Sequence, residues 1–332
     1  MNSKDIFSTY TGDLKLVEQQ LMDIFKSDVF LIPLVGRHIL SSGGKRIRPL
    51  FHLLSADLCG FKGPERLLLA AIIEAIHTAS LLHDDVIDEA QTRRGKPAAN
   101  ALWGNQMVIL IGDFLYSTAL KLAVFQKNQA VMEALSEATT RMTEGELLQL
   151  HRVGDPDITR EEYFQIISAK TGVLISAACR IGALLGKESE EREAALARFG
   201  LKTGIAFQLA DDVLDYVARQ KDLGKKLGKD LEEGKITMPL IYLLQAASDP
   251  EKEEVREIIK ETGAVQKNRA TSMNGSLDRI TGLFAKYNAI EEALKSAREL
   301  IEEAKAELQV FPDSPGKEAI LAMAEYAMQR KE

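Results

Sequence analysis

Apolar residues recur at helical spacing along nearly the whole chain. Residues 65–82 consist of strong helix formers without glycine or proline, and residues 129–150 and 190–216 show the same apolar periodicity. The alternation of β-branched and polar residues between turn signals that would indicate strands is absent, so we expect no sheet. The pattern predicts an all-α protein.

Short clusters of glycine and proline separate the predicted helices. They lie at residues 41–44, 60–64, 93–97, 154–156 and 224–234. None of them is long or polar enough to be an interdomain linker. We therefore predict one all-α domain over residues 1–332, a single large bundle of about a dozen helices.

Composition and charge narrow the choice of partners. Of the 332 residues, 45% are hydrophobic and 27% are charged, which is typical of a globular protein with a large core. The net charge of −7 disfavours nucleic acid and anionic membranes as partners.

The N-terminus lacks a signal-peptide pattern, and the most apolar run, residues 107–125, is interrupted by Asp113 and Lys121, so we expect no transmembrane segment. Cys59 and Cys179 lie in apolar stretches, which indicates buried thiols and a cytoplasmic location.

Two short acidic motifs are candidates for metal chemistry. They are DDVID, with Asp84, Asp85 and Asp88, and DDVLD, with Asp211, Asp212 and Asp215. In a helix, the first and last aspartates of each motif share a face, and carboxylates beside an apolar run are unfavourable unless a cation neutralises them. Oxygen ligands in this number suit Mg²⁺. One such motif could equally be a solvated helix face or a set of N-caps, but two copies favour a metal site. Neither motif has the loop pattern of an EF-hand.

Basic residues flanked by glycine accompany these motifs. Residues 43–49, GGKRIRP, lead into an apolar helix, so their cations lie at a helix N-terminus, which favours anions. Residues 92–97, TRRGKP, form a predicted loop after the first motif, and Lys225 and residues 228–235 follow the second. Each basic run alone could be a solvated surface, but their repeated order predicts phosphate groups and divalent metal in one cavity. The glycine patterns of nucleotide-binding loops do not occur.

In this order, the motifs resemble the trans-prenyltransferases, the head-to-tail isoprenyl diphosphate synthases. The matching segments are GGKRIRP, HTASLLHDDVIDEAQTRRGKPAAN, the Lys170–Thr171 pair, FQLADDVLDY and LGKKLGKDLEEGKITMPLIY. The resemblance implies the isoprenoid synthase type I fold, with helices around a central cavity. It also implies Mg²⁺-dependent condensation of isopentenyl diphosphate with an allylic diphosphate (farnesyl or shorter), with roughly two to three metal ions, and a homodimer. The two aspartate motifs would face each other across the cavity.

The resemblance also implies individual roles. Asp84, Asp88 and Asp211 would ligate magnesium, with Asp85, Asp212 and Asp215 as further ligands or as support for them; Arg93, Lys170, Lys225 and Lys235 would hold the allylic diphosphate; Lys45, Arg48, His77 and Arg94 would hold isopentenyl diphosphate; and Thr171 and Gln208 would flank the developing carbocation. His77 has a second interpretation as a core histidine.

Within the family, the chain is most similar to the long-chain members that make the side chain of respiratory quinones. Glu146 and Gln149 stand where farnesyl-type members have Gln and Asp. A class I terpene cyclase is disfavoured because it has no second diphosphate for the basic segments to hold. A short-chain farnesyl- or geranylgeranyl-type synthase and a non-catalytic partner subunit remain alternatives, although a non-catalytic subunit would be expected to lose acidic ligands.

Small residues before the first motif bear on product length. Ser80 and Ala79 lie four and five residues before Asp84, about one helical turn away, where short-chain relatives commonly carry a bulky aromatic residue. Small residues in a helix often reflect close packing alone, but at this position they favour an open tunnel. From there past Ile76 to Ile72 the helix covers about three turns, which is room for at least three or four isoprene units. We expect a product of about C30–C50, with C40 favoured by the resemblance.

Overall fold

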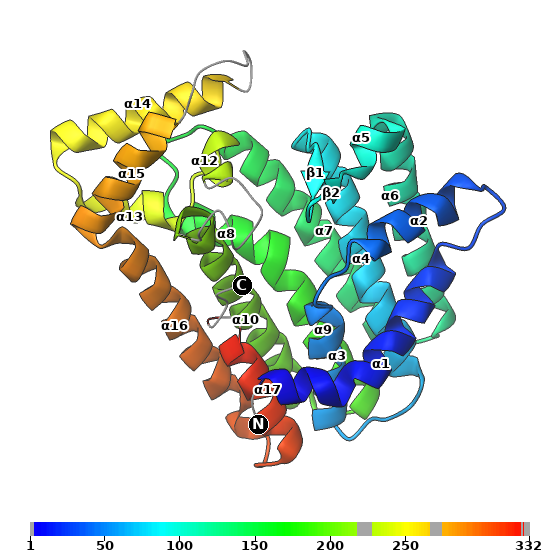
Figure 1. The fold of residues 1–332 in the computed structure, drawn as a ribbon. Helices are drawn as coiled ribbons and strands as arrows, with labels where there is room; N and C mark the ends of the chain where they lie inside the picture. The colour runs from blue at the N-terminus through cyan, green and yellow to red at the C-terminus, as the bar shows by residue number, and fades with distance from the viewer. Residues whose placement is uncertain (1–2, 218–227, 266–273, 327, 329–332) are drawn as a thin grey trace. The chain divides into compact units, whose positions relative to one another are not determined.

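The described part of the chain is almost entirely helical (Figure 1). A computed structural model describes residues 3–217, 228–265, 274–326 and 328. The predicted all-α class is confirmed, and the three helices predicted with the clearest periodicity are α4 (Glu65–Ile87), α7 (Gln129–Arg152) and α10 (Glu190–Val217). Each extends one to five residues beyond the predicted range, because backbone hydrogen bonding sets a helix end and the apolar pattern does not mark it.

Short helices make the observed elements more numerous than the predicted dozen. The other helices are α1 Ser3–Ile24, α2 Leu31–Ser41, α3 Ile47–Leu58, α5 Ala99–Trp103, α6 Asn105–Phe125, α8 Arg160–Ile167, α9 Val173–Gly186, α12 Lys229–Glu232, α13 Met238–Ala246, α14 Asp249–Val265, α15 Asn274–Tyr287, α16 Ala289–Glu307 and α17 Pro315–Tyr326, with a π-helical turn η1 at Ser168–Gly172 and a 3₁₀ turn η2 at Leu308–Val310. Segments as short as α5 and α12 span too few residues to show a period.

One small sheet corrects the expectation of none. β1 (Thr92–Arg93) pairs antiparallel with β2 (Lys96–Pro97), so the segment predicted as a loop is a tight hairpin. Its two turn residues, Arg94 and Gly95, have φ values of 50° and 74°, which is the backbone of a two-residue hairpin turn. Strands of two residues are too short to produce a visible alternation.

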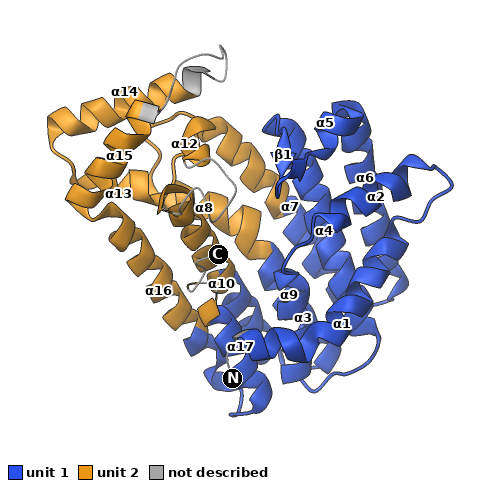
Figure 2. Ribbon diagram, viewed as in Figure 1, with its two compact units in different colours: residues 1–140, 174–201, 305–324 blue, residues 141–173, 202–304, 325–332 orange. Residues whose placement is uncertain are grey.

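The chain groups into two compact units, coloured separately in Figure 2. Unit 1 comprises residues 1–140, 174–201 and 305–324, and unit 2 comprises residues 141–173, 202–304 and 325–332. Helices α7, α9, α10, α16 and α17 contribute residues to both units. The single domain expected from the sequence stays a prediction.

Unit 1 is organised around α4. This helix packs against α1, α3, α5 and α6, and Ile72, Ile73 and Ile76 on it are fully buried. Two charges are buried with them, because Nη1 of Arg46, before α3, donates to Oε1 of Glu74 at 3.1 Å. Burying either charge alone would be unfavourable, so the pair fixes the start of α3 to the middle of α4.

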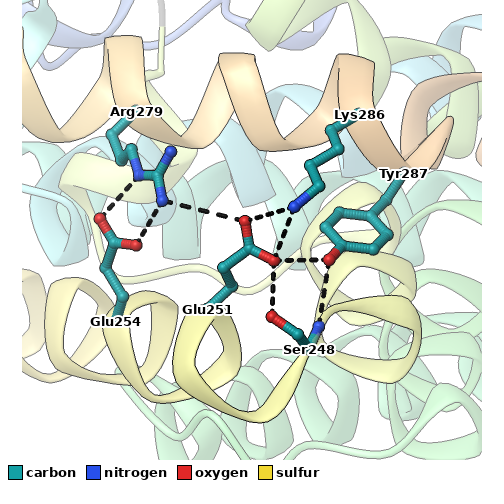
Figure 3. Close-up of polar contacts among 6 residues, drawn as sticks. All are labelled: Ser248, Glu251, Glu254, Arg279, Lys286 and Tyr287. Carbon is teal, nitrogen blue, oxygen red and sulfur yellow. Dashed lines mark hydrogen bonds and ion pairs between the residues drawn. The ribbon is translucent and has the colours of Figure 1, made fainter.

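In unit 2, α13 packs against α8, α14 and α15. Figure 3 shows polar contacts between α15 and α14, together with Ser248, which precedes α14. Arg279 donates to both oxygens of Glu254 at 2.7 Å. Glu251 accepts hydrogen bonds from Lys286 and Tyr287. Hydrogen bonds from Lys286, Ser248 and Tyr287 lower the pKa of Glu251 to about 2. These contacts align the two helices along an exposed surface.

Two observations bear on the expected location of the protein. Burial raises the pKa of Cys59 and Cys179 to about 12, so both thiols stay protonated at neutral pH. Three described helical spans, residues 65–87, 105–125 and 160–186, are long and apolar enough to cross a membrane by length and composition. The first and third are mostly buried within the protein, and α6 is only one-third buried. The absence of a transmembrane segment stays a prediction.

Candidate functional site

The first aspartate motif closes α4 in unit 1. Asp85 is 3% exposed, and its two carboxylate oxygens each accept a hydrogen bond from Nε of Arg93 at 2.8 Å. Asp84 and Asp88 are one turn apart, on a different side of the helix, and both are partly exposed. Asp85 therefore anchors the β1–β2 hairpin (the arginine hairpin) to α4, and the ligand role of the outer two aspartates stays a prediction.

Cations from the GGKRIRP segment gather beside the middle of α4. Arg48 donates to Nε2 of His77 at 3.0 Å, so this histidine is an acceptor there and carries its proton on Nδ1. Burial lowers the pKa of His77 well below its ordinary value, and the positive charges of Arg48, Arg93 and Arg94 lower it further. A neutral histidine surrounded by guanidinium groups marks a region of positive potential that favours an anion. Lys45, in the same segment, is exposed.

The arginine hairpin is docked on the glycine loop that precedes α3. Arg94 donates to the carbonyl of Gly43, and Nζ of Lys96 donates to the carbonyl of Ser41 at 2.7 Å. Nε2 of His38 donates to the carbonyl of Pro97 at 2.9 Å. The four residues predicted to hold isopentenyl diphosphate thus come from three places. Lys45 and Arg48 belong to the GGKRIRP segment, Arg94 belongs to the hairpin that contacts it, and His77 belongs to α4. A pocket open to solvent lies between the same segments; its lining includes Arg46, Glu74, Thr78, Asp85, Arg93 and Arg94.

The residues assigned to product length lie on the same helix. Ile76 and Ala79 are fully buried, and Ser80 is partly buried with its hydroxyl donating to the carbonyl of His77 at 2.9 Å. All three precede Asp84 on α4. The tunnel itself stays a prediction.

The second aspartate motif lies on α10 in unit 2. Asp212 is 5% exposed and accepts hydrogen bonds from the hydroxyl of Tyr163 and from Nε2 of Gln208. Oδ2 of Asp215 accepts from the backbone N–H of Asp230 at 3.0 Å. Burial raises the pKa of Asp212 to about 7, and burial together with the carboxylates of Asp212 and Asp215 raises the pKa of Asp230 well above its ordinary value. This concentration of carboxylates favours a bound cation.

Lys170 and Thr171 lie on the π-helical turn η1. Nζ of Lys170 contacts Oε2 of Glu146 at 2.6 Å and Oε1 of Gln149 at 3.0 Å, the two residues that depart from the farnesyl-type pattern. Oγ1 of Thr171 donates to Oε1 of Gln208 at 2.8 Å. A π-helical turn is rare and occurs often at functional sites.

Two glycines allow this turn to sit close to its neighbours. A Cβ at Gly145 on α7 would lie 2.6 Å from Cβ of Ala169, and a Cβ at Gly204 on α10 would lie 2.7 Å from Cα of Gly172. Any larger residue at either position would push the helices away from η1. The glycines therefore bring Lys170 and Thr171 within reach of their partners.

The remaining predicted cations follow the second motif. Lys235 makes an ion pair with Glu233 at 2.7 Å. Lys225 lies outside the described residues. The two aspartate motifs belong to different compact units, so their predicted arrangement across one cavity stays a prediction.

The carboxylates available for a metal ion suit magnesium. Among residues 3–217, 228–265, 274–326 and 328, no three or more His, Cys, Asp or Glu side chains form a group that could hold a metal ion. Magnesium does not need such a cage, because it binds through one or two carboxylates together with phosphate oxygens and water. Asp84 and Asp88 in unit 1, and Asp211 and Asp215 in unit 2, provide carboxylate pairs of that kind, so the residues fit magnesium held with a diphosphate.

Sequence reasoning missed three contributors to these sites. Tyr163 had no signal, because one tyrosine in a helix is an ordinary core residue. Asp230 was noted only within a basic segment. Glu74 had a signal that could have been used, since it is a lone charge within an apolar helical run, and such a charge indicates a buried partner.

Comparison with known proteins gives a consistent result. The family model of "Polyprenyl synthetase" matches residues 31–273. The chain is 39% identical to octaprenyl diphosphate synthase of Escherichia coli K12, covering 99% of both chains, and 37% identical to an all-trans-nonaprenyl-diphosphate synthase (geranyl-diphosphate specific) of Rhodobacter capsulatus, covering 98% of both. Among solved structures, a polyprenyl synthase of Caulobacter crescentus complexed with calcium and isoprenyl diphosphate has a TM-score of 0.90 at 36% identity, covering 98% of this chain and 97% of the other.

Proposed function

Because this chain belongs to the polyprenyl synthetase family, we propose that it is a long-chain all-trans polyprenyl diphosphate synthase making the side chain of a respiratory quinone. The enzyme condenses isopentenyl diphosphate head-to-tail with an allylic diphosphate such as farnesyl diphosphate or a shorter primer. The observation that carries the proposal is full-length similarity to octaprenyl and nonaprenyl synthases together with both aspartate motifs. The product is expected to be about C40, within C30–C50.

The aspartate motifs are proposed to hold the allylic diphosphate through magnesium. Asp84 and Asp88, and Asp211 and Asp215, are the proposed ligands, while Asp85 and Asp212 support them through Arg93 and through Tyr163 with Gln208. Bound magnesium would neutralise the charge that develops on the departing pyrophosphate. The calcium and isoprenyl diphosphate of the Caulobacter relative support this assignment.

The cationic residues form two groups, one for each diphosphate. Lys45, Arg48, His77 and Arg94 are proposed to hold isopentenyl diphosphate, and Lys170, Arg93, Lys225 and Lys235 the allylic diphosphate. Isopentenyl diphosphate keeps its diphosphate during the reaction, so cations alone suffice for it. The Arg48 contact with neutral His77 supports this, because an anion bound there meets guanidinium groups and an imidazole N–H donor.

The rate then arises from positioning and electrostatics. The isopentenyl double bond attacks the allylic carbon as pyrophosphate leaves, and the departed pyrophosphate accepts the proton that the new chain loses. No side-chain nucleophile is needed. Lys170, ion-paired with Glu146, would exchange that partner for the diphosphate.

A product assay separates this function from its alternatives. Purified protein is incubated with isopentenyl diphosphate, farnesyl diphosphate and Mg²⁺, and the products are extracted and identified by mass spectrometry. A polyprenyl diphosphate of about C40 is expected from the protein alone. A C15 or C20 product would indicate a short-chain synthase. A cyclic hydrocarbon would indicate a terpene cyclase, and inactivity without a second protein would indicate a partner subunit.

The metal assignment predicts the effect of removing single aspartates. Asp84→Ala and Asp211→Ala should each lower kcat by two orders of magnitude or more, about the loss of a main electrostatic contribution. Binding of Mn²⁺ in the presence of a diphosphate, followed by electron paramagnetic resonance, should weaken in both. Asp313→Ala is the matched control, because that side chain is fully exposed. Turnover near the wild-type rate in both variants would contradict the assignment.

The proposed enzyme is a cytoplasmic homodimer. The described part of α6 exposes large apolar side chains, including Leu110 and Phe125, each 63% exposed. An exposed apolar surface of this kind favours association with a second copy.

A further inference from the structure

A chain of hydrogen bonds runs through unit 2 from α8 to α10 and on to η1. The hydroxyl of Tyr163 donates to Oδ2 of Asp212, and Nε2 of Gln208 donates to Oδ1 of the same carboxylate at 2.8 Å. At the other end, Oγ1 of Thr171 donates to Oε1 of Gln208 at 2.8 Å. Tyr163, Asp212 and Thr171 are 2%, 5% and 7% exposed and Gln208 is partly buried, so the chain is largely shielded from water.

The chemistry of the groups fixes the direction of the chain. In its ionised form, the carboxylate of Asp212 accepts from both neighbours, and the amide nitrogen of Gln208 faces Oδ1 of Asp212. Its amide oxygen then faces Thr171, and the single hydroxyl proton of Thr171 is used to donate to that oxygen. Thr171 keeps its lone pairs and has no proton left to offer to any other group.

We propose that Tyr163, acting through Asp212 and Gln208, is a positioning residue that presents Thr171 to the substrate as a hydrogen-bond acceptor only. This inference rests on the proposed function, because departure of pyrophosphate leaves positive charge on an allylic carbon. An oxygen that directs lone pairs toward that charge stabilises it, whereas a hydroxyl proton in the same place would oppose it. The same orientation makes Thr171 unsuited to bind the diphosphate oxygens, which are acceptors themselves.

The surrounding elements hold Tyr163 in place for this role. Helix α8 begins with a capping box in which Thr159 and Glu162 satisfy each other's backbone N–H groups, and Tyr163 follows directly. Arg152 also contacts Glu162. At the other end, Gly204 lets α10 approach η1 closely enough for Gln208 to reach Thr171. The tyrosine thus lies on α8, which carries none of the predicted metal ligands, and it contacts α10, which carries the second aspartate motif.

The test compares the binding of two inert allylic diphosphate analogues in the presence of Mg²⁺. One carries a protonated amine where positive charge develops, and the other is its neutral carbon isostere. Isothermal titration calorimetry gives the ratio of their dissociation constants, which is a measure of cation stabilisation that does not depend on turnover. Wild-type protein should prefer the amine. Tyr163→Phe and Thr171→Val should each reduce that preference by about 10-fold, as expected for one hydrogen bond to a charged group.

Three further variants separate positioning from general damage. The double variant Tyr163→Phe/Thr171→Val should lose no more preference than Thr171→Val alone, because both residues act through the same chain. Thr171→Ser keeps a hydroxyl and should retain the preference. Tyr242→Phe is the matched control: it removes a partly buried tyrosine hydroxyl that contacts Oγ of Ser296 at 2.7 Å, outside this chain, and should leave the ratio unchanged.

The kinetic counterpart is a lower kcat in Tyr163→Phe, by about 10-fold, with an unchanged KM for isopentenyl diphosphate. An analogue ratio that Tyr163→Phe leaves at the wild-type value would overturn the proposal, and so would additive losses in the double variant. Failure of the proposed function looks different, because wild-type protein would then bind neither analogue and form no prenyl product.

Discussion

His52 is fully buried on α3, where its Nδ1 lies 3.0 Å from the carbonyl of Ala178 on α9. Burial lowers its pKa from 6.5 to about 4. Between these two values the unfolded chain binds a proton that the folded protein excludes, so the free energy of unfolding falls as pH drops from 6.5 to 4. Below pH 4 both states are protonated and the loss is complete. The shift corresponds to about 3 kcal/mol.

Urea denaturation at pH 7.5, 5.5 and 4.5 measures this effect. His52→Gln keeps a group that can hydrogen bond to the Ala178 carbonyl but does not titrate, so its stability should fall by up to about 3 kcal/mol less than the wild type over that range. Other titrating groups contribute equally to both proteins and cancel in the comparison. Parallel stability curves for the two proteins would show that His52 is protonated without cost in the folded state.

Side-chain partners are the part of the site that one sequence reveals least. The motif aspartates and the Lys170–Thr171 pair could be assigned roles because their order along the chain is specific. The contact of Lys170 with Glu146 could not, since it joins residues from α7 and η1 that no local pattern connects. The ion pair of Arg46 with Glu74 could be predicted only in part. A lone glutamate in an apolar helix requires a partner, but the sequence does not show which residue it is.

At the scale of elements, periodicity located the long helices and failed at their junctions. The predicted start of α4 at residue 65 is the observed one, because Pro64 marks it, while its end at Ile87 lies beyond the apolar run. The hairpin at residues 92–97 depends on Arg94 and Gly95 adopting positive φ, a property that glycine signals and arginine does not. The π-helical turn η1 has no sequence signature at all, since its residues are ordinary helix residues.

The close approach of α10 to η1 predicts the effect of one added methyl group. Gly204→Ala would place Cβ 2.7 Å from Cα of Gly172, which is backbone and cannot move aside. We expect a loss of about 1–3 kcal/mol in stability and a lower kcat, because the contact of Thr171 with Gln208 would be stretched. Thermal unfolding and steady-state kinetics provide the two measurements.

Gly282→Ala is the matched control for that variant. Gly282 lies in the interior of α15, is exposed, and has nothing within 4 Å of an added Cβ. Alanine there should stabilise the protein by up to about 1 kcal/mol through helix propensity, with unchanged kinetics. Equal effects of the two alanines on stability would show that the space around Gly204 is not limiting.

At the scale of the whole molecule, family and reaction followed from the sequence, and product length and assembly did not. The order of the motifs can be read from the sequence without a structure. Product length depends on which side chains close a tunnel, and these come from helices distant in sequence. Ala79 and Ser80 therefore set only a lower limit. The arrangement of the two aspartate motifs likewise depends on how units 1 and 2 meet, which no local pattern encodes.

The proposed homodimer gives a prediction for α6. Leu110→Glu places a charge in its exposed apolar surface and should shift the protein from dimer to monomer, which sedimentation velocity measures as a halved mass. Leu16→Glu is the matched control, because Leu16 is 44% exposed and belongs to α1 rather than to α6. A dimer that persists in Leu110→Glu would place the interface elsewhere.

A membrane is the other environment that could cover α6, since the helix is long and apolar enough to cross one. Two charges on it argue for a protein partner: Asp113 has a side chain that is 59% exposed, and Lys121 is exposed as well. Such charges are costly in the interior of a bilayer, whereas the polar rim of a protein interface accommodates them. Wild-type protein should therefore remain in the lower fractions when floated with phospholipid vesicles, and so should Leu110→Glu. Flotation of the wild type that Leu110→Glu abolishes would mean that α6 meets lipid instead of a second copy.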